Sequence, residues 1–252
     1  MINLKYIKYF ILILLCVVSF YLSDQVILYV ESLSPIMQTI REVENNYNTK
    51  PIDAIIEGNT IIPGKKGTIV NERESYLKMN EFGVFNENFF VYDYIKPDIS
   101  LSDFKDKIIV GSSKKEYVSI IIDDFKFREY LGDNKYSYVI KDNNIKIISN
   151  VTYINGSVDN YKSINNYLNS KNKLSNIILA ENASIHDNKD NYIISPTIDI
   201  YHSNYYSTIS KIEGGSIIYV HDNVTSSEFK VLMDTIKHKK LGIMELTEFI
   251  SE

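Results

Sequence analysis

The most pronounced hydrophobic pattern in the chain is an uninterrupted apolar run near its N-terminus. Tyr9 to Leu22 follows two basic residues, Lys5 and Lys8. No polar face breaks the run, so a core helix of a soluble protein explains it poorly. As a helix it spans about 21 Å, less than the roughly 30 Å hydrocarbon core of a bilayer. The run predicts a membrane anchor over residues 1–23, with a cleaved signal peptide as the alternative.

Residues within and before the run bear on that choice. Signal cleavage requires small residues at the first and third positions before the cut, and Val17 with Ser19 is the only tolerable pair, which favours an uncleaved anchor. The preceding lysines predict that the N-terminus stays inside and the rest of the chain outside. Cys16 is the single cysteine and lies within the run, so an intramolecular disulfide is excluded. The residues before it lack the small residue expected ahead of a lipidated cysteine.

Periodic apolar positions after the anchor predict first a linker and then a small mixed region. A helix that begins near Ser34 is expected to link the anchor to the folded part, over residues 24–50. Residues 51–115 contain short strand-like runs and one helix introduced by Asn71, which suits a helix N-cap. This stretch predicts a small α+β region.

From residue 116 onward, predicted strands and helices alternate. The clearest are the buried strands Tyr117 to Ile122 and Ser216 to Val220, and the helix Ser226 to Lys237, preceded by a capping box. Such alternation predicts an α/β domain over residues 116–252, with a largely parallel sheet covered by helices. The other expected elements are helices at 125–131, 158–168 and 205–212 and strands at 136–140, 145–148, 176–180, 192–195 and 243–246.

Composition limits the function classes. With 252 residues, 44% of them hydrophobic and 23% charged, the chain suits one large domain or two small ones. Its net charge is −5, and without Lys5 and Lys8 the remainder has 25 basic against 32 acidic residues. Nucleic-acid binding depends largely on basic residues that neutralise phosphates, so we expect no nucleic-acid partner.

Two acidic or histidine-containing segments follow predicted strands, where α/β folds place functional groups. Asp123 and Asp124 follow one strand, and His221 and Asp222 follow another. Because carboxyl ends of parallel strands gather at one side, Asp123 and His221 should face the same end of the sheet. The aspartates could be a base and a metal ligand, or one could cap the next helix. His221 could be a general acid oriented by Asp222, or simply part of a turn.

Three segments resemble the polysaccharide deacetylases, metal-dependent hydrolases that remove acetyl groups from chitin-like or peptidoglycan sugars. Gly215 to Asp222 (GSIIYVHD) resembles the strand that supplies the catalytic acid, and Val118 to Asp124 is similar to the family's first motif. The stretch from Ile61 to Pro97 resembles a segment ahead of divergent deacetylase-like domains in membrane-anchored proteins of Gram-positive bacteria. The resemblance implies a trimmed (β/α) barrel with Asp123 and His221 as catalytic residues and Asp124 as a metal ligand.

The chain departs from that family at the metal site. The family's second motif has two metal-binding histidines three residues apart, and His186, His202, His221 and His238 contain no such pair. The family's Arg-Pro motif is missing too. Catalytic metals normally have three protein ligands, and Asp124 alone matches here. We therefore expect no cofactor, or a divalent ion such as zinc if the protein is active, and we expect His186 and His202 at the surface.

These observations leave three functions open. The favoured hypothesis is a membrane-anchored, noncatalytic deacetylase-like protein that binds cell-envelope glycan or a partner protein, with tyrosines that could stack on sugar rings. The second is a divergent carbohydrate deacetylase that uses Asp123, Asp124 and His221. The third is a structural envelope component without a ligand. A single-pass location in the cell membrane is expected, or secretion if the signal is cleaved.

Overall fold

The chain forms two compact units. The computed structural model describes residues 4–141, 147–148, 151–156, 160–181 and 191–252. Unit 1 comprises Met1–Lys50 and Gly67–Ile95, and unit 2 comprises Pro51–Lys66 and Lys96–Glu252. The region expected at residues 51–115 is therefore divided between the units. The reason is long-range pairing, since the strand at residues 60–62 lies parallel to one at residues 108–109 in unit 2.

Helix α1 (Leu4–Ser32) is longer than the apolar run that predicted it. After the polar residues at 23–25 the sequence becomes apolar again, so the helix continues past Leu22. Tyr9–Ser32 forms a 24-residue stretch, about 36 Å long, which contains an 18-residue window with mean hydropathy 2.2 and no buried residue. This apolar helix fits a signal anchor or a signal peptide.

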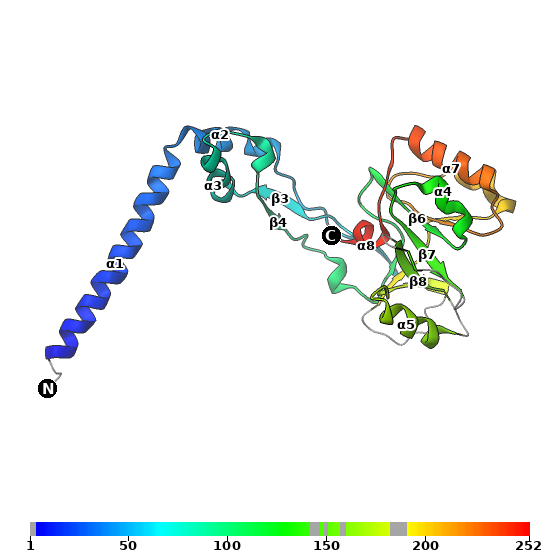
Figure 1. Cartoon of the computed structure of the whole chain (residues 1–252), viewed down its shortest axis with the longest axis horizontal. Helices are drawn as coiled ribbons and strands as arrows, with labels where there is room; N and C mark the ends of the chain where they lie inside the picture. The colour runs from blue at the N-terminus through cyan, green and yellow to red at the C-terminus, as the bar shows by residue number, and fades with distance from the viewer. Residues whose placement is uncertain (1–3, 142–146, 149–150, 157–159, 182–190) are drawn as a thin grey trace. The chain divides into compact units, whose positions relative to one another are not determined.

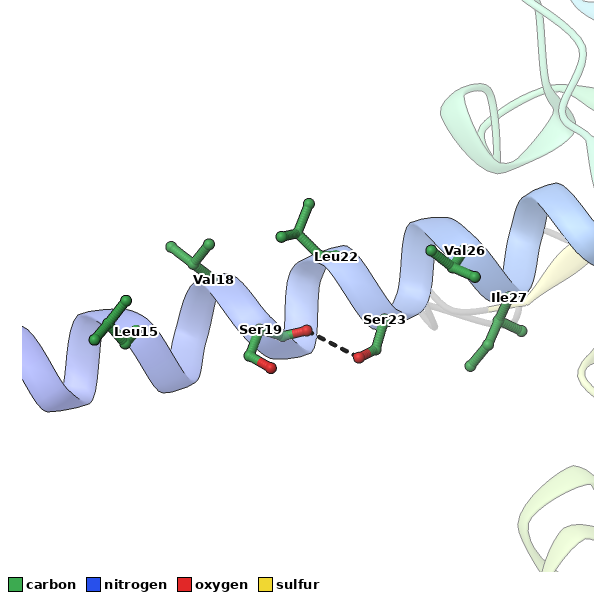
Figure 2. Close-up of a pocket in the computed structure, with 7 residues that line it drawn as sticks. All are labelled: Leu15, Val18, Ser19, Leu22, Ser23, Val26 and Ile27. Atoms are coloured by element: carbon green, nitrogen blue, oxygen red, sulfur yellow. Dashed lines mark hydrogen bonds between the residues drawn. The ribbon is translucent and has the colours of Figure 1, made fainter.

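A shallow hollow runs along the surface of α1. Figure 2 shows its lining residues and a hydrogen bond of 2.9 Å from Ser23 Oγ to the Ser19 carbonyl oxygen. Seven uncharged residues line it: Leu15, Val18, Ser19, Leu22, Ser23, Val26 and Ile27. Without an ionisable group the hollow offers no acid–base chemistry.

The rest of unit 1 is a small α+β arrangement. Helix α2 (Pro35–Val43) is followed by a 3-10 turn at Glu44–Asn46. Strands β3 (Gly67–Val70) and β4 (Tyr92–Ile95) pair antiparallel, and α3 (Glu72–Phe82) and a 3-10 turn at Glu87–Phe89 lie between them in sequence. The Asn71 side chain caps α3, as its sequence predicted. The buried core residues are Met37, Ile40, Val70, Tyr76, Met79 and Phe90.

Unit 2 contains two largely parallel sheets. The larger has the order β11-β12-β6-β7-β8, with β13 also beside β6, and all its pairings are parallel. Its strands are β6 (Tyr117–Ile122), β7 (Tyr136–Ile140), β8 (Val151–Asn155), β11 (Ile198–Ile200), β12 (Ile217–Val220) and β13 (Gly242–Ile243). The second sheet is β1-β2-β5-β10-β9, with strands β1 (Ile55–Glu57), β2 (Thr60–Ile62), β5 (Ile108–Ile109), β9 (Ile177–Leu179) and β10 (Tyr192–Ile194). The expected α/β class is confirmed.

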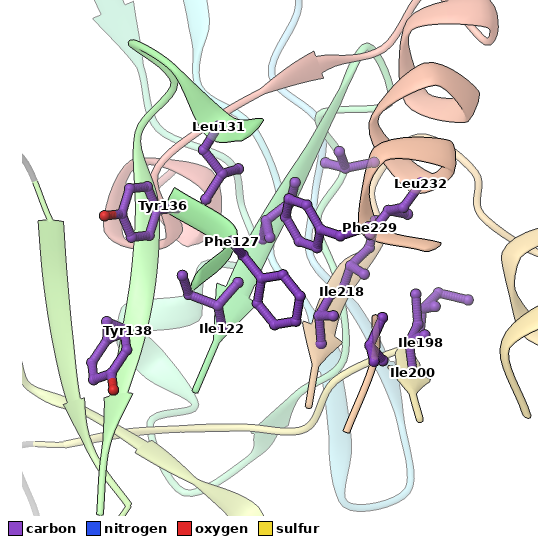
Figure 3. Close-up of a cluster of buried hydrophobic side chains, with 14 of the residues drawn as sticks. Ile122, Phe127, Leu131, Tyr136, Tyr138, Ile198, Ile200, Ile218, Phe229 and Leu232 are labelled. Carbon is purple, nitrogen blue, oxygen red and sulfur yellow. The ribbon is translucent and has the colours of Figure 1, made fainter. Parts of the chain in front are cut away.

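Side-chain alternation along the strands divides the core of unit 2 into two layers. On β6, Ile120 and Ile122 join the cluster that packs against helices, whereas Ile121 joins the cluster shared by both sheets. Figure 1 shows α4 and α7 beside each other near β6, and Figure 3 shows Phe127 and Phe229 meeting in the helix-side layer. The helices are α4 (Arg128–Leu131), α5 (Tyr161–Ser170), α6 (Tyr205–Ile209), α7 (Ser226–His238) and α8 (Leu246–Ile250), with 3-10 turns at Leu101–Asp103, Phe125–Phe127 and His202–Asn204.

Two expected strands differ from the structure. Of the strand expected at 145–148, the first two residues lie outside the described residues, and Ile147 and Ile148 form no strand. The next strand of the sheet is β8, which the sequence pattern missed. The strand expected at 243–246 ends at Ile243, and Leu246 begins α8. Strands β3, β5 and β11 were also missed, because runs of two to four residues carry little periodic signal.

The capping box of α7 provides a stability prediction. Thr225 Oγ1 accepts a hydrogen bond from the Glu228 backbone N–H at 3.2 Å, and the Glu228 carboxylate accepts one from the Thr225 backbone N–H at 2.8 Å. Thr225→Ala is expected to lower the free energy of unfolding by about 1 kcal/mol. Thr235→Ala on the same helix is the control, since its hydroxyl only donates to the Val231 carbonyl oxygen. Urea denaturation should show a clearly smaller loss for the control, and equal losses would contradict the prediction.

Candidate functional site

Charged side chains gather at the carboxyl ends of four neighbouring strands of the larger sheet. Asp123 directly follows β6, Lys141 follows β7, His221 follows β12, and Asp199 lies on β11. β6 and β12 are parallel neighbours, with Ile122 opposite Val220. Alternation places the residue after Ile122 on the inner side, toward the layer between the sheets. The sequence-based expectation that Asp123 and His221 share one end of the sheet is confirmed.

His221 lies between two carboxylates. Its Nδ1 is 3.3 Å from Asp123 Oδ2, and its Nε2 is 2.6 Å from Asp199 Oδ1. The imidazole stacks on the Tyr201 ring, with centroids 3.8 Å apart and planes at 9°, and lies 4.1 Å from the Tyr219 ring. Only 11% of the His221 side chain is exposed. The ring is thus held at both nitrogens and on its faces.

Asp123 is the most enclosed group of the site, with 1% of its side chain exposed. Lys141 Nζ donates to Asp123 Oδ2 at 2.7 Å, and the Tyr219 hydroxyl donates to the same oxygen at 3.4 Å. The Tyr138 hydroxyl donates to the Asp123 backbone carbonyl oxygen at 3.2 Å. In the described part of the chain, Asp123 Oδ1 has no hydrogen-bond partner. We call Asp123, Lys141, Asp199, Tyr219 and His221 the Asp123–His221 cluster.

The short distances between the ionisable groups of the cluster shift their pKa values. Burial alone would raise the pKa of Asp123, but hydrogen bonds from His221 and Lys141 outweigh it and hold that pKa below its usual value. Burial alone would lower the pKa of His221, but the carboxylates of Asp123 and Asp199 raise it to about 9. Burial and the Asp123 charge both raise the pKa of Tyr219. At neutral pH these shifts favour the carboxylate form of Asp123 and the imidazolium form of His221.

This arrangement predicts how stability depends on pH. The folded state raises the His221 pKa from 6.5 to about 9, so it binds the proton more tightly than the unfolded chain. The resulting stabilisation is fully present below about pH 6.5 and is lost as the pH rises through about 9. We expect the free energy of unfolding to fall by about 2–3 kcal/mol over that window. Denaturation of the full-length protein in detergent at stepped pH measures this, and a flat profile from pH 6.5 to 9.5 would contradict it.

Asp124 lies near the cluster in sequence but has another structural role. Its Oδ1 accepts a hydrogen bond from the Lys126 backbone N–H at 2.9 Å, and its Oδ2 is 3.1 Å from Lys126 Nζ. Lys126 Nζ also donates to the Asp222 carbonyl oxygen. Asp124 is therefore the cap of the 3-10 turn that begins at Phe125, the alternative that its sequence left open.

Three members of the cluster, Lys141, Asp199 and Tyr219, were not predicted from the sequence. Asp199, not Asp222, makes the described contact that orients His221. Its one sequence signal is an acidic residue between two isoleucines on a three-residue strand, Ile198–Ile200. Lys141 follows β7 and resembles any surface lysine, with 53% of its side chain exposed. Only its contact with Asp123 in the folded protein distinguishes Lys141 from other surface lysines.

The site does not fit a catalytic metal. Among the described residues, no three His, Cys, Asp or Glu side chains are grouped so that they could hold an ion. Asp123 and Asp124 each already lie against a lysine ammonium. His202 is exposed at the surface, as expected, and its Nδ1 lies 2.9 Å from Glu228 Oε1. His186 lies outside the described residues.

Comparisons with known proteins place this geometry in context. No family model matches the chain. The chain is 32% identical over 102 residues to the uncharacterized protein YlxY of Bacillus subtilis (strain 168), a match that covers 40% of this chain and 32% of that relative. The structure of BA3943 from Bacillus anthracis, a CE4 family pseudoenzyme, matches with TM-score 0.59 and 18% identity over 86% of this chain and 95% of that chain. The chain therefore has the fold of the CE4 family.

A BA3943 mutant with restored enzymatic activity matches equally well, with TM-score 0.57 and 18% identity over 86% of this chain and 98% of that one. These structures support the resemblance to deacetylases at the level of the fold. The Asp123–His221 cluster thus lies at the carboxyl ends of the strands of a CE4 fold, where α/β folds place their sites.

Proposed function

We propose that this protein is a membrane-anchored, noncatalytic deacetylase-like protein that binds cell-envelope glycan outside the membrane. The observation that carries the proposal is the internal pairing of the cluster. Asp123 is paired with Lys141 and His221, and the other nitrogen of His221 is paired with Asp199. Such a site is suited to binding and poorly suited to turnover.

The pairing opposes acid–base catalysis. A general base must be free to take a proton and works best with a pKa near the working pH. The Asp123 pKa is held below its usual value, because its burial is outweighed by the bonds from His221 and Lys141. Asp123 Oδ2 already has three donors around it: Lys141, Tyr219 and His221.

The same pairing opposes a catalytic metal. The Lys141 ammonium lies 2.7 Å from the carboxylate that a cation would approach. A divalent ion there would be repelled by both Lys141 and the protonated His221. We therefore propose that no metal cofactor is used, and we derive no hydrolytic step through one.

Aromatic side chains beside the cluster support a sugar ligand. Tyr201 is half-buried and stacks on His221, and Tyr219 forms part of a pocket of about 150 Å³. Sugar-binding sites combine aromatic faces with a few fixed polar groups, and this end of the sheet offers both.

The apolar surface of α1 supports the anchor. Its Tyr9–Ser32 stretch is unburied and about 36 Å long, enough to cross a bilayer of roughly 30 Å. Lys5 and Lys8 precede that stretch, which favours an N-terminus inside and the two folded units outside.

Glycan binding is tested by titrating the full-length protein in detergent with N-acetylated chitin oligomers, followed by calorimetry. We expect saturable binding that Tyr201→Ala weakens at least about fivefold, since one lost aromatic contact costs about 1 kcal/mol. Tyr206→Ala is the matched control, because Tyr206 is 81% exposed on α6. Absence of binding, or equal loss in both variants, would contradict the proposal.

A divergent hydrolase is the second candidate, favoured by one observation. Asp123 Oδ2 and His221 Nδ1 lie within 3.3 Å, as a catalytic pair would. Acetate release separates this candidate from noncatalytic binding.

A further inference from the structure

We propose that an exposed aromatic patch on unit 1 rests on the outer surface of the membrane, where it contacts lipid headgroups and the upper acyl chains. Phe82, Val84, Phe85 and Phe89 form this patch, which we call the Phe82 patch. The inference rests on the proposed membrane anchor and adds a second lipid contact to it. It follows from the exposure of the patch, from the turn that carries it, and from its distance to the end of α1.

The Phe82 patch leaves large apolar side chains in solvent. Phe82 is 62% exposed and Val84 is 53% exposed. All 11 phenylalanines of the sequence lie in the described part of the chain, and only Phe10, Phe20 and Phe82 are exposed. The first two are on the apolar helix α1. Neighbouring exposed apolar side chains of this kind mark interaction surfaces, including membrane contacts.

A turn at the end of α3 holds the Phe82 patch together. Gly83 adopts a left-handed conformation, with φ of 67°, and ends the helix. The chain then reverses, and the rings of Phe82 and Phe89 stack with centroids 4.9 Å apart and planes at 15°. Phe85 and Phe89 also pack against the core of unit 1. The core therefore supports the patch from the inside, while Phe82 remains exposed.

Contacts within unit 1 keep the Phe82 patch near the end of α1. Arg73 Nε, in the first turn of α3, lies 3.3 Å from Glu31 Oε2, in the last turn of α1. Only Leu33 and Ser34 separate α1 from α2. Figure 1 shows α2 and α3 together at this end of α1. Because the 11 residues of α3 span about 16 Å, the patch at its other end lies within about that distance of α1.

The membrane surface lies within this reach. The Tyr9–Ser32 stretch is about 36 Å long and the hydrocarbon core of a bilayer is roughly 30 Å thick, so the end of α1 lies among the headgroups. Apolar side chains this close to the headgroups leave water by entering the boundary between headgroups and acyl chains. Glu81 and Glu87, which lie beside the patch in sequence, would be repelled by anionic lipids. The contact is therefore apolar and suits a zwitterionic lipid surface.

The test uses the absence of tryptophan from the sequence, since one substitution then gives one fluorophore at one position. Full-length Phe82→Trp is placed in phosphatidylcholine vesicles with and without bromine on the upper acyl chains, a quencher that acts by contact. We expect brominated lipid to remove at least about a third of the fluorescence, because interfacial side chains lie about 5–10 Å into the boundary between headgroups and acyl chains. Val84→Trp is expected to lose a similar fraction.

Two further variants are the controls. Leu22→Trp lies within the apolar stretch of α1 and should be quenched by the same lipid. Tyr206→Trp replaces a side chain that is 81% exposed on α6 of unit 2, and it should keep its fluorescence. The two controls give the signals expected inside the membrane and in water.

The outcomes separate the inference from the proposed function. Quenching of Leu22→Trp without quenching of the two patch variants would overturn the inference and leave the anchor standing. A blue shift of the Phe82→Trp emission without quenching would show that a protein surface covers the patch, and equal quenching of Tyr206→Trp would show that the patch has no special contact with lipid. Either result would also overturn the inference. If Leu22→Trp is not quenched, the anchor of the proposed function fails as well.

Discussion

His221→Gln is expected to lower the free energy of unfolding by about 2–3 kcal/mol at pH 6.5. The substitution removes the cation that links Asp123, with 1% of its side chain exposed, to Asp199. Removing one partner of a buried ion pair typically costs about 3–5 kcal/mol, and the loss here is smaller because Asp199 is 47% exposed and screened by solvent.

His202→Gln is the matched control. His202 also faces a carboxylate, at 2.9 Å, but 63% of its side chain is exposed. His202→Gln should lower the free energy of unfolding by less than about 1 kcal/mol. Chemical denaturation in detergent should further show that His221→Gln lowers the free energy of unfolding by less at pH 9.5, where the wild-type imidazole is largely neutral. Equal losses of unfolding free energy in the two variants, or a loss in His221→Gln that does not change with pH, would show that His221 does not form ion pairs with Asp123 and Asp199.

Phe229→Ala is expected to lower the free energy of unfolding by about 3–5 kcal/mol, more than any other substitution considered. Phe229 on α7 is fully buried and stacks on Phe127 with ring centroids 4.5 Å apart. Truncation leaves a cavity between α7 and the larger sheet, and buried aromatic residues replaced by alanine typically cost this much. Figure 3 shows how Ile122, Ile218 and Leu232 surround the site of the cavity.

Val231→Ala on the same helix is the control, since Val231 is 51% exposed. Its effect on the urea midpoint should correspond to less than about 0.5 kcal/mol. A Phe229→Ala loss below about 1 kcal/mol would mean that α7 does not pack as described.

Asp123 and His221 could be predicted as site residues because each follows a strand made almost entirely of apolar residues. The six residues of β6 are apolar except for Ser119, and the four residues of β12 are all apolar. Parallel pairing then brings Asp123 and His221 together. Asp199 and Lys141 could not be predicted in the same way. Their roles depend on contacts across 22 and 18 residues of sequence, and neither has a local pattern that marks it.

Long-range pairing also explains the missed boundaries. The sequence gives no sign that residues 51–66 join unit 2 while residues 67–95 belong to unit 1. The polar residues Ser23 and Asp24 suggested the end of the anchor, but the Ser23 hydroxyl bonds back to the Ser19 carbonyl oxygen and the helix continues. Polar residues within a helix satisfy themselves locally in this way, so they do not by themselves end it.

Acetate release tests the noncatalytic proposal most directly. The purified full-length protein in detergent is incubated with N-acetylated chitin oligomers or peptidoglycan, with and without added zinc or cobalt. We expect no acetate above the buffer control, because Asp123 is paired with Lys141 and His221 and Asp124 is paired with Lys126. Metal-dependent release that disappears in Asp124→Asn, or metal-independent release that disappears in Asp123→Asn, would contradict the proposal.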